Sequence, residues 1–234
     1  MRFIRAGITF LVSTLLYFVV CGLAYGGPVI VSATGAGPLL ASAEDLTGTG
    51  VTEIQGGLSG DPNDVSLFEI SILDPLDFSA LTVDAGPFGI PDTELFLFNS
   101  AGLGVYFNDD ITPSNTLSCL PSSGLANPCP TPAAGLGPAT AGNYYLGIAR
   151  SANAPLDASG NEIFTNVLST DVVGPNPGVG ALAGWDGGAN TQPNFDLVNY
   201  DILITGTQPE PATWTLAAGA LLAAGLFRRR LRVR

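Results

Sequence analysis

The chain has 234 residues, of which 20 are acidic and 8 are basic, and it contains no histidine. All eight basic residues are arginines, and seven of them lie in the first five or the last seven positions, which leaves Arg150 for the long middle segment. This composition argues against nucleic acids and anionic lipids as partners of the middle segment, because binding phosphate requires cationic side chains. It also excludes catalytic triads that use histidine or lysine as the base, and it favours divalent cations or basic partners.

Residues 1–26 have the layout of a secretory signal peptide. Arg2 and Arg5 precede an apolar run over 8–20, and small residues follow at 24–27. The run is short for a membrane span, so we predict a signal peptide helix that signal peptidase removes by cleavage after Gly26. One alternative is an uncleaved N-terminal anchor. Another is a lipoprotein modified at Cys21, although no small residue stands just before that cysteine.

Residues 27–208 are predicted to form one all-β domain. The chain's thirty glycines and eighteen prolines disfavour long helices. Over Val65–Leu73, alternation places Phe68, Ile70 and Ile72 on one face, which is typical of a half-buried strand. Val198–Thr205 alternates in the same way and is predicted to be the last strand of the domain.

Two further strands are apolar on both faces, namely Thr93–Phe98 and Tyr144–Ala149. Both are therefore predicted to be inner strands that are covered on two sides. Weaker strand candidates lie between Gly, Pro, Asn and Asp residues: Val29–Ser32, Val51–Gln55, Leu81–Asp84, Val105–Phe107 and Ile163–Val167. Eight or nine short strands predict a β-sandwich of jelly-roll type.

Two segments without periodicity, 119–141 and 151–192, are predicted to be long surface loops. The first contains Cys119 and Cys129, the pair that remains once Cys21 leaves with the signal peptide. Export favours a disulfide between them, which should stabilise by less than about 3 kcal/mol because the loop is short. A zinc site is the alternative, but two cysteines without histidine do not complete a usual zinc shell.

Oxygen-rich turns supply candidate metal ligands. Asn108, Asp109 and Asp110 lie in one turn, and Asp61 and Asp64 lie in another. Calcium takes several carboxylate and carbonyl oxygens, so these five residues form a candidate calcium site, although neither turn matches an EF-hand. The alternative is that they are turn-forming residues on a solvated edge.

The same acids and one tryptophan allow two other functions. Asp109 with Asp110, or Asp61 with Asp64, could be the carboxylate pair of a glycosidase, but adjacent acids on a strand project to opposite faces. Trp185 could stack on a sugar ring in a carbohydrate-binding module, or it could be a packed loop aromatic. The middle segment contains no other recognisable catalytic arrangement, and we predict that the protein is not an enzyme.

The C-terminal end has three parts. Pro209-Glu210-Pro211 is followed by an apolar stretch over 212–227 and then by five arginines in the last seven positions: Arg228, Arg229, Arg230, Arg232 and Arg234. Sixteen helical residues span roughly 24 Å, just short of a hydrocarbon core of about 30 Å. The arginines would hold this transmembrane helix with its end in the cytoplasm.

This tail, 209–234, resembles the PEP-CTERM sorting signal of Gram-negative bacteria. The resemblance implies recognition by an exosortase, a membrane cysteine protease that cuts near Pro-Glu-Pro in bacteria that make exopolysaccharide. The precursor would then be tethered in the inner membrane before it reaches the cell envelope, the cell surface or the biofilm matrix. The alternative is an ordinary tail anchor that is never cut.

The middle segment is similar to the bacterial pre-peptidase C-terminal domain. The similar stretches occur in that family's order: Asp61–Ile70, Asp92–Gly102 with Asn108–Asp110, Ala141–Ile148 and Tyr200–Gly206. The resemblance implies a secreted β-sandwich with a role in adhesion, solubility or sorting, although no protease domain accompanies it here. The sequence therefore predicts an exported, non-enzymatic surface or exopolysaccharide-associated protein, with a carbohydrate-binding module or an acid-pair hydrolase as alternatives.

Overall fold

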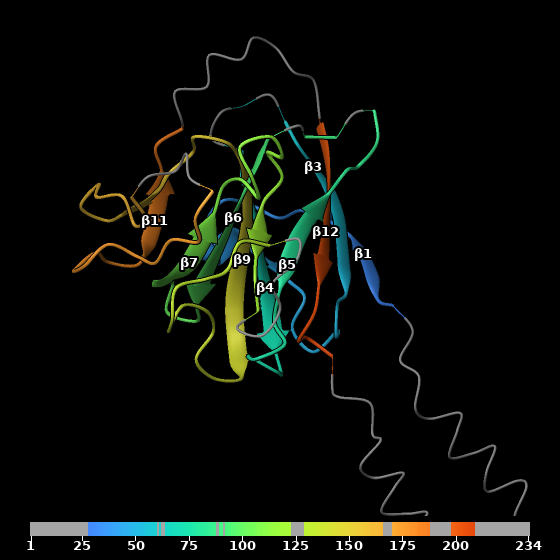
Figure 1. The fold of residues 1–234 in the computed structure, drawn as a ribbon, viewed down its shortest axis with the longest axis horizontal. Helices are drawn as coiled ribbons and strands as arrows, with labels where there is room; N and C mark the ends of the chain where they lie inside the picture. The colour runs from blue at the N-terminus through green and yellow to red at the C-terminus, as the bar shows by residue number, and fades with distance from the viewer. Residues whose placement is uncertain are drawn as a thin grey trace, which may run out of the picture. The chain divides into compact units, whose positions relative to one another are not determined.

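Two five-stranded sheets and a two-stranded sheet make up most of the regular structure that the computed structural model describes (Figure 1). The described residues are 28–59, 61, 64–87, 89–90, 92–122, 129–165, 170–187 and 198–208. The first sheet has the strand order β1 (Ile30–Ser32), β3 (Glu53–Leu58), β12 (Val198–Ile204), β5 (Ala80–Val83) and β8 (Cys119–Leu120). The second has the order β2 (Glu44–Asp45), β4 (Ser66–Ile72), β9 (Gly142–Arg150), β6 (Thr93–Asn99) and β7 (Gly104–Asn108). The third pairs β10 (Pro155–Asp157) with β11 (Leu182–Trp185).

Both large sheets are mixed. β1 pairs with β3 in parallel and β2 pairs with β4 in parallel, whereas the other pairs of named strands are antiparallel. The one helix among the described residues is a single 3₁₀ turn at Leu40–Ser42. The fold class is therefore all-β, as the sequence predicts.

The main core lies between the two five-stranded sheets. Inward side chains of β4, β6 and β9 meet those of β3, β5 and β12 in one apolar cluster, and Phe68 contacts Tyr200 edge to face. The alternation of apolar residues along β4 explains its contribution to this core, because Phe68, Ile70 and Ile72 share one face and are fully buried. The half-buried pattern predicted for this strand is thus confirmed on its core side.

A second apolar cluster covers the opposite face of the second sheet. Phe96, Phe98 and Phe107 pack there against Phe164, with ring centroids 5.1–6.4 Å apart. Every residue from Thr93 to Phe98 is buried. The prediction that this strand is covered on both faces is therefore confirmed.

The cover over that face corrects one prediction. The segment 151–192 is predicted to be a surface loop, but its described part forms β10 and β11 and contributes Ile163, Phe164 and Leu182 to the second cluster. The expected strand Ile163–Val167 is absent over its described part, residues 163–165, where the backbone forms bends. β10 and β11 are three and four residues long, too short to show a periodic pattern among the surrounding glycines and prolines.

The two ends of the chain lie outside the described residues. These ends are the predicted signal peptide over 1–26 and the sorting tail over 209–234, including the predicted span over 212–227. Within the described part, no helix has both the length and the apolar character that crossing a membrane requires. The described strands belong to one compact unit, Pro28–Gln208.

Candidate functional site

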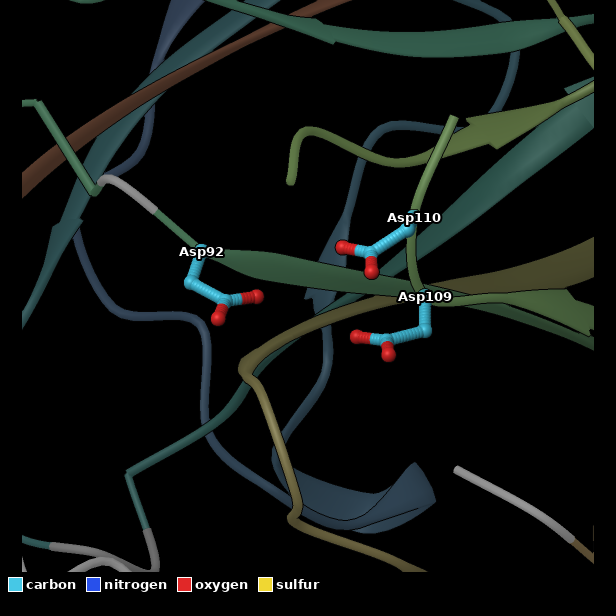
Figure 2. Close-up of side chains that lie close together, drawn as sticks. All are labelled: Asp92, Asp109 and Asp110. Carbon is cyan, nitrogen blue, oxygen red and sulfur yellow. The ribbon is translucent and has the colours of Figure 1, made fainter. Parts of the chain in front are cut away.

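Three aspartates gather at one end of the β6–β7 hairpin (Figure 2). Asp92 stands just before β6, whereas Asp109 and Asp110 follow β7 directly. The two strands are antiparallel with Leu95 opposite Asn108, so the start of β6 and the end of β7 lie side by side. One carboxylate oxygen from each aspartate lies within 4.8 Å of the others.

The three carboxylates are poorly solvated. Asp109 is 2% exposed, and Asp92 and Asp110 are half-buried. The Oδ1 atom of each is buried and has no hydrogen-bond partner. In Figure 2 the carboxylates of Asp109 and Asp110 point toward Asp92 from the far side of the gap.

A fourth acid, Glu94, lies on the same face of the hairpin. Alternation places it with Phe96 and Phe98, and the register places it opposite Asp109. Glu94 is fully buried, and its two carboxylate oxygens accept hydrogen bonds from the backbone N–H groups of Ala152 and Asn153 at 3.0 and 3.1 Å. Both of its carboxylate oxygens thus have backbone donors, whereas the Oδ1 atoms of the three aspartates have none.

Burial and like charges dominate the electrostatics of this site. Burial, followed by the nearby charges of Asp110 and Asp92, raises the pKa of Asp109 to about 8. Burial and Asp110 raise the pKa of Asp92, and burial raises that of Asp110. Burial and Asp109 raise the pKa of Glu94 well above its usual range, against the effect of its two N–H donors.

Ser151 links the cluster to the turn after β9. Its hydroxyl interacts with both Asp92 and Asp109 and lowers the pKa of each, against the larger effect of burial. Its backbone N–H also donates to the carbonyl of Asp92 at 3.4 Å. Three segments that are distant in sequence therefore meet at the cluster.

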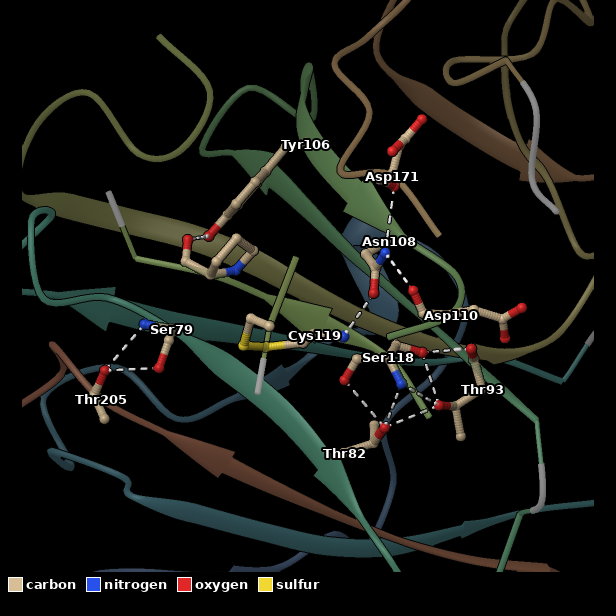
Figure 3. Close-up of a disulfide and its surroundings, with 12 residues drawn as sticks. Ser79, Thr82, Thr93, Tyr106, Asn108, Asp110, Ser118, Cys119, Asp171 and Thr205 are labelled. Carbon is tan, nitrogen blue, oxygen red and sulfur yellow. Dashed lines mark hydrogen bonds between the residues drawn. A yellow bond between two sulfur atoms is a disulfide. The ribbon is translucent and has the colours of Figure 1, made fainter. Parts of the chain in front are cut away.

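The structure brings together part of the calcium site predicted from the sequence. Asp109 and Asp110 belong to the cluster, but the side chain of Asn108 is used elsewhere. Its Oδ1 accepts the N–H of Cys119 at 2.8 Å, and its Nδ2 donates to the carbonyls of Asp110 and Asp171 (Figure 3). Asn108 therefore joins β7 to β8 and does not contribute to the cluster.

The other predicted ligands also lie apart from it. Asp64 accepts a hydrogen bond from the N–H of Ser59, while the N–H of Asp61 donates to the Ser59 hydroxyl at 3.2 Å. Asp64 also interacts electrostatically with Arg150. Neither belongs to the carboxylate group formed by Asp92, Asp109 and Asp110. The backbone N–H of Asp64 also donates to the carbonyl of Asp61 at 3.0 Å.

Sequence reasoning missed Asp92 and Glu94. The available signal was a charged residue next to or inside a strand that is otherwise apolar on both faces, Thr93–Phe98. Such a position places a carboxylate in the interior, where it requires partners.

A disulfide and a polar network lie beside the cluster (Figure 3). Cys119 and Cys129 are bonded, with their Cα atoms 5.3 Å apart. Next to Cys119, the Ser118 hydroxyl meets that of Thr93 at 2.7 Å, and the Thr93 hydroxyl meets that of Thr82 at 2.9 Å. These buried hydroxyls link the first sheet to the second at the start of β6.

Trp185 is a packing residue. Its ring meets Phe96 and Phe98 edge on, with centroids 5.2 and 6.4 Å away, and its Nε1–H donates to the carbonyl of Pro38 at 2.7 Å. Among the described tyrosines, Tyr106, Tyr144 and Tyr200 are buried. Tyr145 is half-buried, and the described contacts of Trp185 are those of a packed aromatic side chain.

The cluster suits an ion better than it suits hydrolysis. Retaining glycosidases place their two carboxyl groups about 5–5.5 Å apart on either side of a sugar ring. Here only 2% of Asp109 is exposed, so a sugar ring could not reach its carboxylate. One surface pocket lies elsewhere, lined by residues 99–101, 104–105, 137 and 139–144. The carboxylates could instead surround a divalent cation.

Comparison with known proteins assigns no family or activity to this geometry. No protein-family model matches the chain, and no curated protein matches it.

Proposed function

We propose that this chain is an exported, non-enzymatic protein of the cell surface or extracellular matrix of a Gram-negative bacterium. The observation that carries the proposal is the order of segments in the sequence: residues 1–26 resemble a signal peptide, and 209–234 resemble a PEP-CTERM tail. Between them lies one all-β unit over 28–208 with a bonded cysteine pair. Disulfides persist in oxidising compartments, so this pair supports export.

In this proposal, signal peptidase removes the front of the chain and the apolar tail holds the body outside the inner membrane. An exosortase then cuts near Pro209-Glu210-Pro211. The body acts as a structural or adhesive component, associated with exopolysaccharide, and we retain a jelly-roll sandwich related to the pre-peptidase C-terminal domain as its finer classification. The absence of lysine and histidine throughout the chain supports a role without nucleophilic catalysis.

Replacing Pro209, Glu210 and Pro211 with alanine tests the sorting step. Membrane insertion depends on the apolar stretch over 212–227, and orientation depends on the arginines, so export should proceed normally. We expect the variant to accumulate in the inner membrane at precursor size. Membrane fractionation with immunoblotting measures this.

Residues Pro130, Thr131 and Pro132 offer a matched control, since they form another Pro-x-Pro outside the tail. Their replacement with alanine should leave processing unchanged. If the tail variant and the native protein fractionate identically, the tail is a plain anchor and the sorting proposal is wrong.

A further inference from the structure

The protein compensates the buried aspartates only in part, through the Ser151 hydroxyl. Buried carboxylates in folded proteins are paired, hydrogen-bonded or bound to metals. Here three Oδ1 atoms, those of Asp92, Asp109 and Asp110, are buried without a hydrogen-bond donor. Asp109 is the clearest case, because it is 2% exposed and its carboxylate points toward Asp92 (Figure 2).

The chain has few cations with which to balance this charge. It contains no lysine or histidine, and Arg150 is the one basic residue between positions 28 and 208. Arg150 interacts with Asp64, which lies outside the cluster. Several negative groups that converge at 4.8 Å or less therefore favour a cation supplied by the solvent.

We propose that Asp92, Asp109 and Asp110 bind one calcium ion, which joins the start of β6 to the end of β7. The donor chemistry supports calcium, since hard divalent cations take carboxylate oxygens, and calcium accepts irregular geometry from loop residues. Magnesium requires a nearly ideal octahedron and retains most of its water, which suits a buried group of three carboxylates less well. The hydroxyl of Ser151, which already interacts with Asp92 and Asp109, is placed to support the site.

Binding at this point would order more than one segment. Asp110 is joined through Asn108 to Cys119, and Thr93 follows Asp92 directly and interacts with Ser118. An ion between the two strand ends would therefore hold together the hairpin, the disulfide-bonded segment and the turn after β9. Its role would be structural, and it does not depend on how the tail is processed.

The test compares the full-length protein, purified in detergent, in chelator and in calcium. Calorimetric titration should give one calcium ion per chain, with a Kd in the range of about 10⁻⁴–10⁻³ M that is typical of extracellular modules. At calcium concentrations near 100 Kd, the melting temperature should rise by about 5–10 °C. Magnesium at the same concentration should raise it by less than half as much.

Two variants locate the effect. Asp109→Asn should weaken calcium binding about tenfold or more, because affinity depends on the number of charged ligands. It should also raise the melting temperature in chelator, since it removes a buried carboxyl group whose Oδ1 atom has no hydrogen-bond donor. If the Asp109 carboxylate instead stabilised the fold without an ion, Asp109→Asn would lower the melting temperature in chelator. The control is Asp77→Asn, which makes the same substitution at an exposed position and should bind calcium as the native protein does.

Calcium-independent melting without titration heat would overturn the proposal, as would native affinity in Asp109→Asn or an equal response to magnesium. If Asp109→Asn does not fold, Asp110→Asn at the more exposed position replaces it, with the same expected loss of calcium affinity. Native affinity in that variant would count against the site.

Discussion

At the scale of single residues, the buried acid Glu94 accounts for an unusual backbone conformation nearby. Ala152 has a φ of 67°, in the left-handed region that costs an alanine roughly 1–2 kcal/mol. This conformation belongs to the turn that presents the N–H groups of Ala152 and Asn153 to the Glu94 carboxylate. These hydrogen bonds satisfy both oxygens of a buried side chain, and leaving them without donors would be costly, so the bonds offset the strain.

Gly206 allows a sharper prediction at this scale. Its φ is 74°, and a Cβ there would lie 2.6 Å from both the carbonyl oxygen of Asp74 and the Cα of Phe78. Gly86 has a similar φ of 85° but open space around it. Gly86→Ala should cost about 1–2 kcal/mol in free energy of unfolding from the backbone alone, and Gly206→Ala should cost about 1–3 kcal/mol more from overpacking.

Urea denaturation of the two glycine variants checks this difference. Equal midpoints for the two would show that the chain between Asp74 and Phe78 moves away easily, which would contradict the close approach described here.

At the scale of elements, Asp157 holds the small sheet together. It is the last residue of β10, and its carboxylate accepts N–H groups from Ser159, Asn161 and Gly180 at 2.8–3.0 Å. Gly180 stands just before β11, so one side chain joins both strands to the loop between them. These donors, with Gly180 first, lower the pKa of Asp157 from 3.8 to about 2.

The lowered pKa determines the sign of a pH effect. The ionised carboxylate stabilises the fold fully above its ordinary pKa of 3.8, and this contribution is lost as the pH falls through about 2. Asp157→Asn should therefore be less stable than the native protein at pH 6, and the difference should shrink between pH 4 and pH 2. Melting temperatures across this range measure it.

Asp84→Asn serves as the control, because Asp84 accepts one described backbone N–H, from Gly86. A difference between native protein and Asp157→Asn that stays constant from pH 6 to pH 2 would contradict the assigned role.

The elements differ in how far their sequences predict them. The long strands β4, β6, β9 and β12 are predictable, because seven or more residues of alternating or continuous apolar character indicate their burial. The cover formed by β10 and β11 is not, since its apolar residues are scattered among glycines and turns. The same limit applies to the carboxylate cluster, because Asp92 joins Asp109 only through the register of the hairpin.

At the scale of the whole molecule, basic and acidic residues lie in different segments of the chain. Every basic residue except Arg150 lies in a predicted targeting segment, while the described unit is strongly acidic. A net negative charge keeps an exported domain soluble and repels its copies. Both targeting segments lie outside the described residues, so sequence patterns carry that part of the account.

The measurement that tests the central claim most directly is the intact mass of the protein recovered from its host bacterium. The account predicts a chain that begins at Gly27, ends near Pro209-Glu210-Pro211 and lacks the C-terminal arginines. The mass should also be lower by two hydrogens for the bond between Cys119 and Cys129, which reduction restores. A mature protein that retains Arg234 would contradict processing of the tail, and one that retains Met1 would contradict removal of a signal peptide.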